Sequence, residues 1–159
     1  MTKAILRSPI GPIMLRCDGT HLVSVDLLAR DREESIAPCE APPGSIAAEA
    51  VRQLGAYFAD GHSAFDLPLA PLQSERGSAL RDAIAAIPPG EMLSYGALAL
   101  RAGSGPRAIG QACARNRFPI IIACHRVIGS GGAIGHYSAG GGVATKIWLL
   151  DHERRGGLL

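Results

Sequence analysis

Apolar and polar residues alternate along two short stretches near the N-terminus, residues 13–17 and 23–27. Because successive side chains of a strand point to opposite faces, each stretch would bury one face of a sheet. Asp18-Gly19 between them favours a turn, which Thr20 and His21 would complete. The pattern therefore predicts an antiparallel hairpin.

From residue 46 the apolar residues recur every three or four positions, which predicts an amphipathic helix that ends at Gly61. Ser45 stands where an N-cap is needed. The proline-rich stretch 38–44 before this helix is typical of a loop. Residues 67–72 carry two prolines among apolar residues and predict an extended linker.

The remaining chain is mostly helical in pattern. We expect a helix over 80–87, a short helix over 95–102 capped by Ser94, a third over 106–115 with Pro106 in its first position, and a last one over 146–155. The second and third are joined by a glycine-containing turn, which fits a helix-turn-helix and equally an ordinary helical hairpin. Residues 118–122 form a short apolar run, interpreted as buried and extended, and the glycine-rich residues 129–142 predict a loop.

These elements predict an α+β fold in two small domains, 1–71 and 72–159. The 159 residues carry a net charge of only +2, which at first argues against a nucleic-acid partner. The charge is unevenly distributed, however: the first domain carries six basic and nine acidic side chains, and the second carries ten basic and five acidic. A modest basic excess is therefore confined to the helical half.

Several classes of protein are excluded by composition. No apolar run approaches the roughly 18 residues that a membrane span needs, and a charge and a proline interrupt the N-terminus before any signal-peptide core forms. Four cysteines in a chain of this length do not make a disulfide scaffold. We expect a cytoplasmic protein (nuclear if the source is eukaryotic) that does not contact membranes.

The clearest candidate for chemistry is Cys124, which is followed directly by His125 and Arg126. A thiol becomes a good nucleophile as the thiolate, so it needs a base or positive charge nearby. A buried, inert cysteine is the alternative, and it is our interpretation of Cys17, Cys39 and Cys113. Cys17 and His21, with His62, offer a competing metal site, but their spacing is not that of known zinc ligands, and we expect no metal.

Motifs along nearly the whole chain combine into a resemblance. They include 122–128 (Ile-Ala-Cys-His-Arg-Val-Ile), 135–138 (Gly-His-Tyr-Ser) and 146–153 (Lys-Ile-Trp-Leu-Leu-Asp-His-Glu). Upstream lie 87–91, 94–96, 107–110 and Asn116, and in the first domain 8–12, 57–58 and 65–69. In this order they closely resemble the O6-alkylguanine-DNA alkyltransferases, also called methylated-DNA–protein-cysteine methyltransferases.

The resemblance implies a ribonuclease-H-like N-terminal domain without that activity and a winged helix-turn-helix-like DNA-binding domain. It implies a single-turnover transfer of an alkyl group from O6 of guanine, or O4 of thymine, in double-stranded DNA to Cys124. It also implies a monomer without cofactor or obligate protein partner. The implied catalytic residues are Cys124, His125, Glu153, Asn116 and Tyr95; the implied substrate and DNA contacts are Arg107, Tyr95, Ser94, Ser138, Tyr137, Arg126, Ala108 and Gly110.

Within this set the resemblance gives His125 the role of drawing the thiol proton through a water, and Glu153 the role of orienting His125 and pairing with Arg126. Tyr95 would donate to the leaving guanine, and Arg107 would enter the base stack in place of the flipped nucleotide.

The chain departs from the family pattern at a few positions. Ala123 replaces a proline before the cysteine, and Arg76 and Arg81 stand at positions that are usually aromatic. Two other functions stay open at this point. One is a damage-binding relative that does not transfer the alkyl group, and the other is a thiol-dependent acceptor that acts on a small alkylated molecule.

Overall fold

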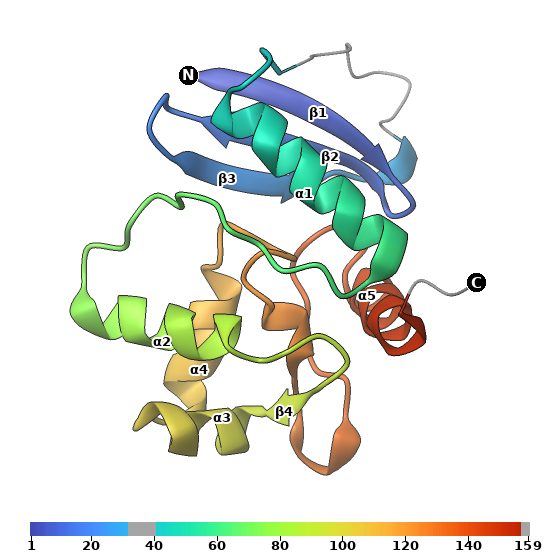
Figure 1. Cartoon of the computed structure of the whole chain (residues 1–159). Coiled ribbons are helices and arrows are strands. Elements are labelled where there is room, and N and C mark those ends of the chain that lie inside the picture. The colour runs from blue at the N-terminus through green and yellow to red at the C-terminus, as the bar shows by residue number, and fades with distance from the viewer. Residues whose placement is uncertain (32–40, 157–159) are drawn as a thin grey trace.

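A computed structural model describes residues 1–31 and 41–156. A small sheet and one helix form the N-terminal domain, and four helices with two short strands form the C-terminal domain below it in Figure 1. This confirms the predicted α+β class. Cys39 and the first part of the predicted loop 38–44 lie outside the described residues.

The sheet has three antiparallel strands in the order β1 (Thr2–Ser8), β2 (Gly11–Cys17) and β3 (Leu22–Leu27). The predicted hairpin corresponds to β2 and β3, and its turn is closed by the Asp18 carboxylate, which accepts from the Thr20 and His21 amides at 2.9 and 2.8 Å. Strand β1 was not predicted, since residues 2–8 lack clear alternation. It forms because its backbone pairs with that of β2 along the whole length of β2, from residue 11 to residue 17.

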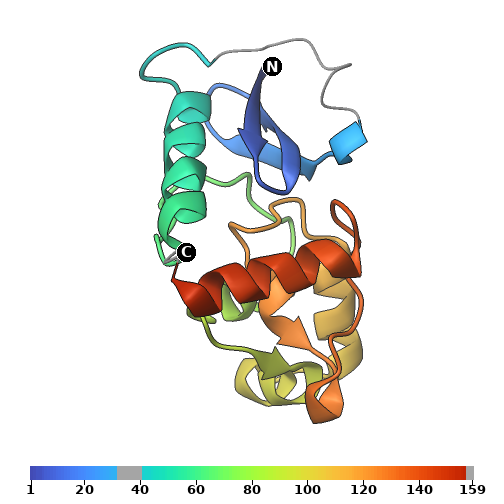
Figure 2. The same cartoon turned by 90° about the vertical axis from the view of Figure 1, so that its right-hand side faces the viewer.

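Helix α1 (Ile46–Asp60) covers one face of the sheet, as Figure 2 shows. The Ser45 side chain caps it by accepting from the Ala48 amide at 3.1 Å, as predicted. Gly61 ends the helix with φ of +73°, and a Cβ at this position would lie 2.8 Å from the His152 carbonyl oxygen. Glycine therefore lets the end of α1 approach the C-terminal domain.

The predicted linker 67–72 is extended, and it is also tied to the sheet. The Leu22 amide donates to the Pro68 carbonyl at 2.7 Å, and the Ala70 amide donates to the Leu22 carbonyl at 2.8 Å. The connection between the two domains is thus held along the edge of β3, which limits how far the chain can swing there.

The C-terminal domain contains α2 (Glu75–Ala85), α3 (Tyr95–Ala102), α4 (Pro106–Ala114) and α5 (Val143–Arg155). A short turn over residues 103–105 joins α3 to α4, so the predicted pair of helices with a glycine-containing turn is present. Strands β4 (Leu93–Ser94) and β5 (Val127–Ile128) pair in parallel beside it. Helix α5 begins three residues earlier than predicted, at Val143.

The prediction that residues 118–122 are extended was wrong. The run is buried but turned: the Ile122 amide donates to the Phe118 carbonyl at 2.8 Å, and Ile120 has φ of +76°. The Asn116 side chain fixes one side of the turn, because its Oδ1 accepts from the Phe118 backbone amide at 2.9 Å. An apolar run of this length does not reveal such a turn by its pattern.

An aromatic cluster joins α1 to α5. Trp148 and His152 stack with ring centroids 4.8 Å apart, and Phe58 lies 6.0 Å from Trp148. His152 also contacts the Tyr57 carbonyl oxygen at 2.9 Å through Nε2. These contacts place α5 between the sheet domain and the remaining C-terminal helices.

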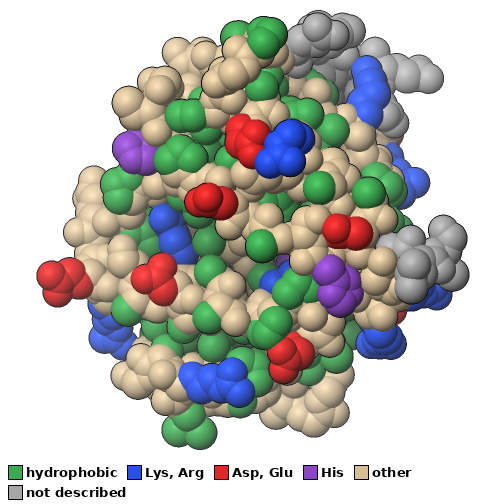
Figure 3. Space-filling view, viewed as in Figure 1, with side chains coloured by type: hydrophobic (Ala, Val, Ile, Leu, Met, Phe, Trp, Pro, Cys, Tyr) green, Lys and Arg blue, Asp and Glu red, His purple; other side chains and the backbone are tan. Residues whose placement is uncertain are grey.

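On the face of the molecule drawn in Figure 3, basic and acidic side chains are interspersed, with hydrophobic side chains visible between them. Within residues 1–31 and 41–156, no helix combines the length and apolar character that crossing a membrane requires.

Candidate active site around Cys124

Cys124 opens a single 3-10 turn, η2 (Cys124–Arg126), directly after the buried 118–122 turn. Its side chain is only 7% exposed, and it lies at the wall of a pocket of about 510 Å³. The pocket is formed by the start of α3, the end of α4 and the glycine-rich loop. Its lining includes Tyr95, Gly110, Cys113, Asn116, Cys124, Tyr137 and Ser138.

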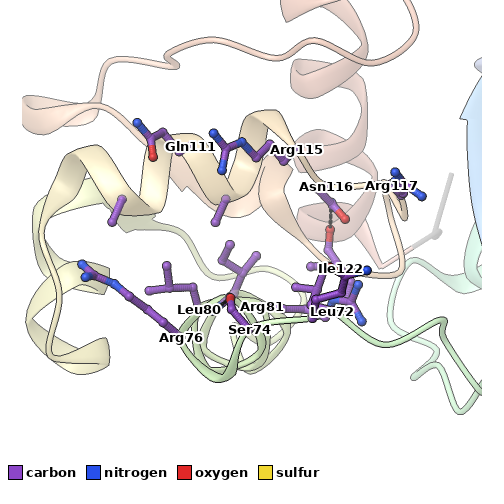
Figure 4. A pocket seen from close by; sticks show the side chains of 15 residues that line it. Leu72, Ser74, Arg76, Leu80, Arg81, Gln111, Arg115, Asn116, Arg117 and Ile122 are labelled. Carbon is purple, nitrogen blue, oxygen red and sulfur yellow. Dashed lines mark hydrogen bonds between the residues drawn. The ribbon is translucent and has the colours of Figure 1, made fainter.

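Asn116 fixes the position of the thiol. Its Nδ2 lies 3.2 Å from Cys124 Sγ and also donates to the Ile122 carbonyl at 2.9 Å (dashed in Figure 4). With the Phe118 amide bound to Oδ1, all parts of the Asn116 amide are engaged. The sulfur is thereby held on a backbone that has little freedom to move.

Behind the thiol lies a fully buried network centred on Glu153 of α5. His125 Nε2 lies 2.5 Å from Glu153 Oε2, and Arg126 Nε donates to Oε1 at 2.7 Å. The Tyr57 hydroxyl of α1 donates to Oε2 at 2.7 Å. The predicted pairing of Arg126 with Glu153 is thus present, and Arg126 also donates to the Ile87 carbonyl at 2.6 Å.

These contacts decide which His125 nitrogen can accept a proton. Hydrogen bonds from His125 and Arg126 hold the Glu153 pKa at about 2 despite burial, so the side chain is a carboxylate that accepts from the Nε2–H. Burial lowers the His125 pKa, which favours the neutral ring. In the described part of the chain His125 Nδ1 has no protein hydrogen-bond partner. Nδ1 is therefore the basic atom.

The thiol is protonated at rest. Burial raises the Cys124 pKa, while the Asn116 contact and the charge of Lys146 act in the opposite direction without cancelling it. A nucleophilic role consequently needs a base, and His125 supplies one at the next position in the chain. The arrangement can activate a thiol at the wall of a pocket large enough for a nucleobase-sized ligand.

Lys146 supports the opposite wall of the pocket. It is fully buried on α5, and its Nζ donates to the Val127 carbonyl at 2.7 Å and the His136 carbonyl at 3.1 Å. Burial lowers the Lys146 pKa. The lysine belongs to the 146–153 motif, but nothing in that motif indicates that its amine would reach the loop.

The alternative metal site is not assembled. Within the described ranges no three His, Cys, Asp or Glu side chains are grouped so that they could hold a metal ion. Cys17 is buried in the sheet, and the His21 Nδ1 contacts the Thr20 hydroxyl at 2.9 Å in an exposed turn.

Comparison with known proteins decides the family. Residues 1–71 match the 6-O-methylguanine DNA methyltransferase ribonuclease-like domain, and residues 77–155 match the DNA binding domain of the same proteins. A methylated-DNA–protein-cysteine methyltransferase of Methanosarcina acetivorans is 38% identical over 96% of this chain and 98% of its own length. The chain belongs to the 6-O-methylguanine DNA methyltransferase family.

Relatives and solved structures of the family agree over nearly the full length. A methylated-DNA–protein-cysteine methyltransferase of Mycobacterium leprae is 38% identical over 92% of this chain and 88% of its own. The Mycobacterium tuberculosis protein OGT, whose crystal structure is in complex with DNA, superposes with a TM-score of 0.79 at 35% identity, covering 97% of this chain and 93% of that one.

The residues that the resemblance to this family implied fall into three places. Tyr95, Gly110, Asn116, Cys124, Tyr137 and Ser138 line the thiol pocket. His125, Arg126 and Glu153 lie buried behind it. Ser94, Arg107 and Ala108 lie outside both groups: Ser94 caps α3, Arg107 is exposed at the start of α4, and Ala108 lines a different cavity between α2 and α4.

Two residues of the site were missed by sequence reasoning. Cys113, interpreted as structural, lines the thiol pocket, and burial raises its pKa to about 12. Tyr57, which the sequence placed on the apolar face of the first helix and within the 57–58 motif, reaches the Glu153 carboxylate across 96 positions of sequence. No local pattern could have paired these residues, because both contacts depend on the tertiary arrangement.

Proposed function

We propose that the chain repairs DNA by direct reversal, transferring an alkyl group from O6 of guanine to Cys124 in a single turnover. The observation that carries the proposal is the buried pair of Glu153 and His125 directly next to a thiol at the wall of a nucleobase-sized pocket. Family membership supports the same reaction, because the similar proteins are named methylated-DNA–protein-cysteine methyltransferases.

The reaction proceeds by displacement at the alkyl carbon. The Cys124 proton passes to His125 Nδ1, directly or through a water, and Glu153 stabilises the resulting imidazolium. The thiolate forms the sulfur–carbon bond as the carbon–O6 bond breaks. Guanine leaves with negative charge, which the Tyr95 hydroxyl neutralises by donating from the start of α3. No cofactor takes part, and the alkylated cysteine ends the cycle.

Double-stranded DNA carrying O6-alkylguanine is the partner that we propose. The alkylated O6 is not open to in-line attack inside a duplex, so the nucleotide must be flipped into the pocket, at a cost of a few kcal/mol. Arg107, exposed at the start of α4, fills the stack. Tyr137 and Ser138 form the wall, Gly110 the floor, and Ser94 and Ala108 position α3 and α4. The OGT structure with DNA supports this assignment by its close similarity.

Arg126 takes a supporting role in this scheme. Its side chain is 6% exposed and pairs with Glu153, so it acts on the reaction by holding the carboxylate that orients His125. We further propose that the domains divide at residues 71 and 72, that the protein acts as a monomer, and that O4 of thymine is a second substrate.

The proposed function is tested with a duplex containing one O6-methylguanine. The protein is mixed with a molar excess of this duplex and then digested. The masses of the peptides that carry Cys124 and Cys113 are measured by mass spectrometry. We expect one methyl group on Cys124, none on Cys113, and no further turnover. Cys113→Ser is the matched control, because it removes the other thiol of the same pocket and should leave transfer intact.

Two outcomes would contradict the proposal. An unmodified Cys124 together with tight binding to the lesion would indicate a damage-binding protein that does not transfer. Release of more than one methylated product per protein would exclude a single-turnover acceptor.

A further inference from the structure

A second cavity lies on the far side of α4 from the thiol pocket. It has a volume of about 570 Å³ and is enclosed by α2, α4 and the turn at residues 115–122. One face of α4 lines it through Ala108, Gln111 and Ala112, whereas Gly110 and Cys113 face the thiol pocket. The proposed alkyl transfer does not use this cavity.

The cavity combines an apolar interior with positive charge. Its apolar lining consists of Leu72, Leu80, Ile84, Ala108, Ala112 and Ile122. Among the described residues no acidic side chain lines it, whereas four arginines do: Arg76, Arg81, Arg115 and Arg117. Figure 4 shows Arg76 at one end of the cavity and Arg117 at the other. Two of these arginines are the departures from the family pattern that the transfer reaction leaves unexplained.

None of the four arginines has a carboxylate within ion-pair distance among residues 1–31 and 41–156. Arg76 donates to the Ser104 hydroxyl at 3.2 Å, and Arg81 donates to the Ala70 carbonyl at 3.0 Å, both neutral acceptors. Arg81 is half-buried, and its guanidinium lies 5.1 Å from the centre of the Phe118 ring. Asp82, next to Arg81 in the chain, stabilises the charged form of Arg81. The four arginines outnumber this carboxylate, and cations gathered at low-dielectric walls attract anions.

Volume and lining together define the ligand. Small-molecule sites have about 300–1,000 Å³, mostly apolar walls and a few polar groups that fix orientation. Planar guanidinium groups bind phosphate in a bidentate manner and stack on aromatic rings. A ligand with a flat aromatic ring and an attached phosphate satisfies both parts of the lining, whereas a purely apolar ligand would offer the arginines no anion.

We propose that the cavity between α2 and α4 is a second binding site that takes a nucleotide, with its base against the apolar wall and its phosphate on the arginines. This goes beyond the alkyl transfer and does not depend on it. The nucleotide has two sources, a free mononucleotide or a nucleotide of bound DNA outside the flipped base.

The site also adjoins the reactive thiol. Asn116 lines the cavity on one side, and its Nδ2 contacts Cys124 Sγ on the other. Ile122, whose carbonyl accepts from the same Nδ2, belongs to the apolar wall. A nucleotide in this cavity therefore contacts the residue that positions the sulfur.

The test uses 2-aminopurine riboside 5′-monophosphate with the full-length protein, and binding is followed as a rise in the fluorescence anisotropy of this probe. We expect saturable binding below about 1 mM and weaker binding of the nucleoside that lacks the phosphate. Arg81→Gln with Arg115→Gln should raise the dissociation constant about tenfold or more, as expected for the loss of charge-assisted hydrogen bonds. Arg154→Gln, an exposed arginine on α5, is the matched control and should change nothing.

Two further variants keep the test independent of folding and of the thiol pocket. Ala112→Leu narrows the cavity while all arginines remain, and it should weaken binding of the probe although its thermal unfolding stays cooperative. Tyr95→Ala alters only the thiol pocket and should leave binding of the probe unchanged. Loss of binding with Tyr95→Ala but not with Ala112→Leu would overturn the proposal, as would absence of saturable binding to the unaltered protein.

A competition experiment then separates the two sources. If one equivalent of unmodified duplex displaces the probe, the occupant is a nucleotide of bound DNA. If the probe stays bound in the presence of the duplex, the occupant is a free nucleotide.

Discussion

Glu153 accepts hydrogen bonds from three side chains although its own is completely shielded from solvent. A carboxylate buried in this way is stable as an ion only while its partners remain, because removing one side of a buried pair leaves the other unpaired. The residues around Cys124 are therefore coupled, and single substitutions among them should act on stability and on reactivity together.

Glu153→Gln removes the charge that balances Arg126 and orients His125. We expect the free energy of unfolding to fall by about 3 kcal/mol and methyl transfer to slow by about a hundredfold or more. Urea denaturation and single-turnover kinetics measure the two effects. Asp151→Asn on the same helix is the control, because Asp151 is half-exposed and its ion pair with Arg154 is long, at 4.0 Å. If Asp151→Asn lowered stability and transfer rate as much as Glu153→Gln, the argument would be refuted.

The same carboxylate predicts a dependence on pH. Because the Glu153 pKa is lowered from 4.5 to about 2 in the folded protein, its stabilising contribution is present above pH 4.5 and is lost as the pH falls toward 2. The shift corresponds to about 3 kcal/mol. The difference in stability between the unaltered protein and Glu153→Gln should shrink over this range in denaturation series at each pH. A difference that stays constant from pH 5 to 2.5 would contradict the assignment.

Among elements, the helix-turn-helix pair depends on the conformation of one residue. Gly103 ends α3 with φ of +64°, whereas Gly105 begins α4 with φ of −108°, and a Cβ added at either glycine would meet no neighbouring atom within 4 Å. Crowding is thus the same at both sites, and only backbone conformation distinguishes them.

Gly103→Ala should destabilise the protein by about 1 kcal/mol, because a left-handed φ is costly for alanine, and should weaken binding to duplex DNA by shifting α4. Gly105→Ala should change the free energy of unfolding by less than about 0.5 kcal/mol. Chemical denaturation of both variants provides the comparison; equal losses would show that the turn does not require the left-handed conformation.

The elements that could be predicted from sequence are those with local signals. Ser45, Ser94 and Pro106 each mark a helix start, and all three helices begin there. Strand β1 and the turn at 118–122 escaped prediction because each is defined by a partner: β1 by the edge of β2, and the turn by the Asn116 side chain. Cys124 and His125 could be selected as candidates because they are neighbours in the chain. Glu153 joined them only through the resemblance, because it lies 28 positions after His125 in the chain.

At the scale of the whole molecule, the sheet domain contributes directly to the reactive site. The Tyr57 hydroxyl donates from α1 to Glu153, and His62 Nε2 contacts the Glu153 carbonyl oxygen at 2.7 Å. The acidic N-terminal domain is thus a structural part of the site that the basic C-terminal domain carries.

Tyr57→Phe tests this connection with the loss of one oxygen atom. We expect a loss of about 1–2 kcal/mol in stability, since the hydrogen bond is buried and its acceptor is charged, and slower methyl transfer. Tyr137→Phe is the matched control for stability, because its buried hydroxyl has no protein partner within the described residues. If both variants lose the same stability in thermal unfolding, the hydrogen bond from Tyr57 to Glu153 does not stabilise the protein.

The two carbonyls that Lys146 binds belong to residue 127, just before the glycine-rich loop, and residue 136, in the middle of that loop. The segment 128–135 between them is therefore closed at its base by one ammonium group. In evolutionary terms, such a loop can change length and sequence while the nucleophile stays in place. Tyr137 and Ser138, which line the thiol pocket, lie beyond this closure, so variation in loop length among members of the family should concentrate between residues 128 and 135.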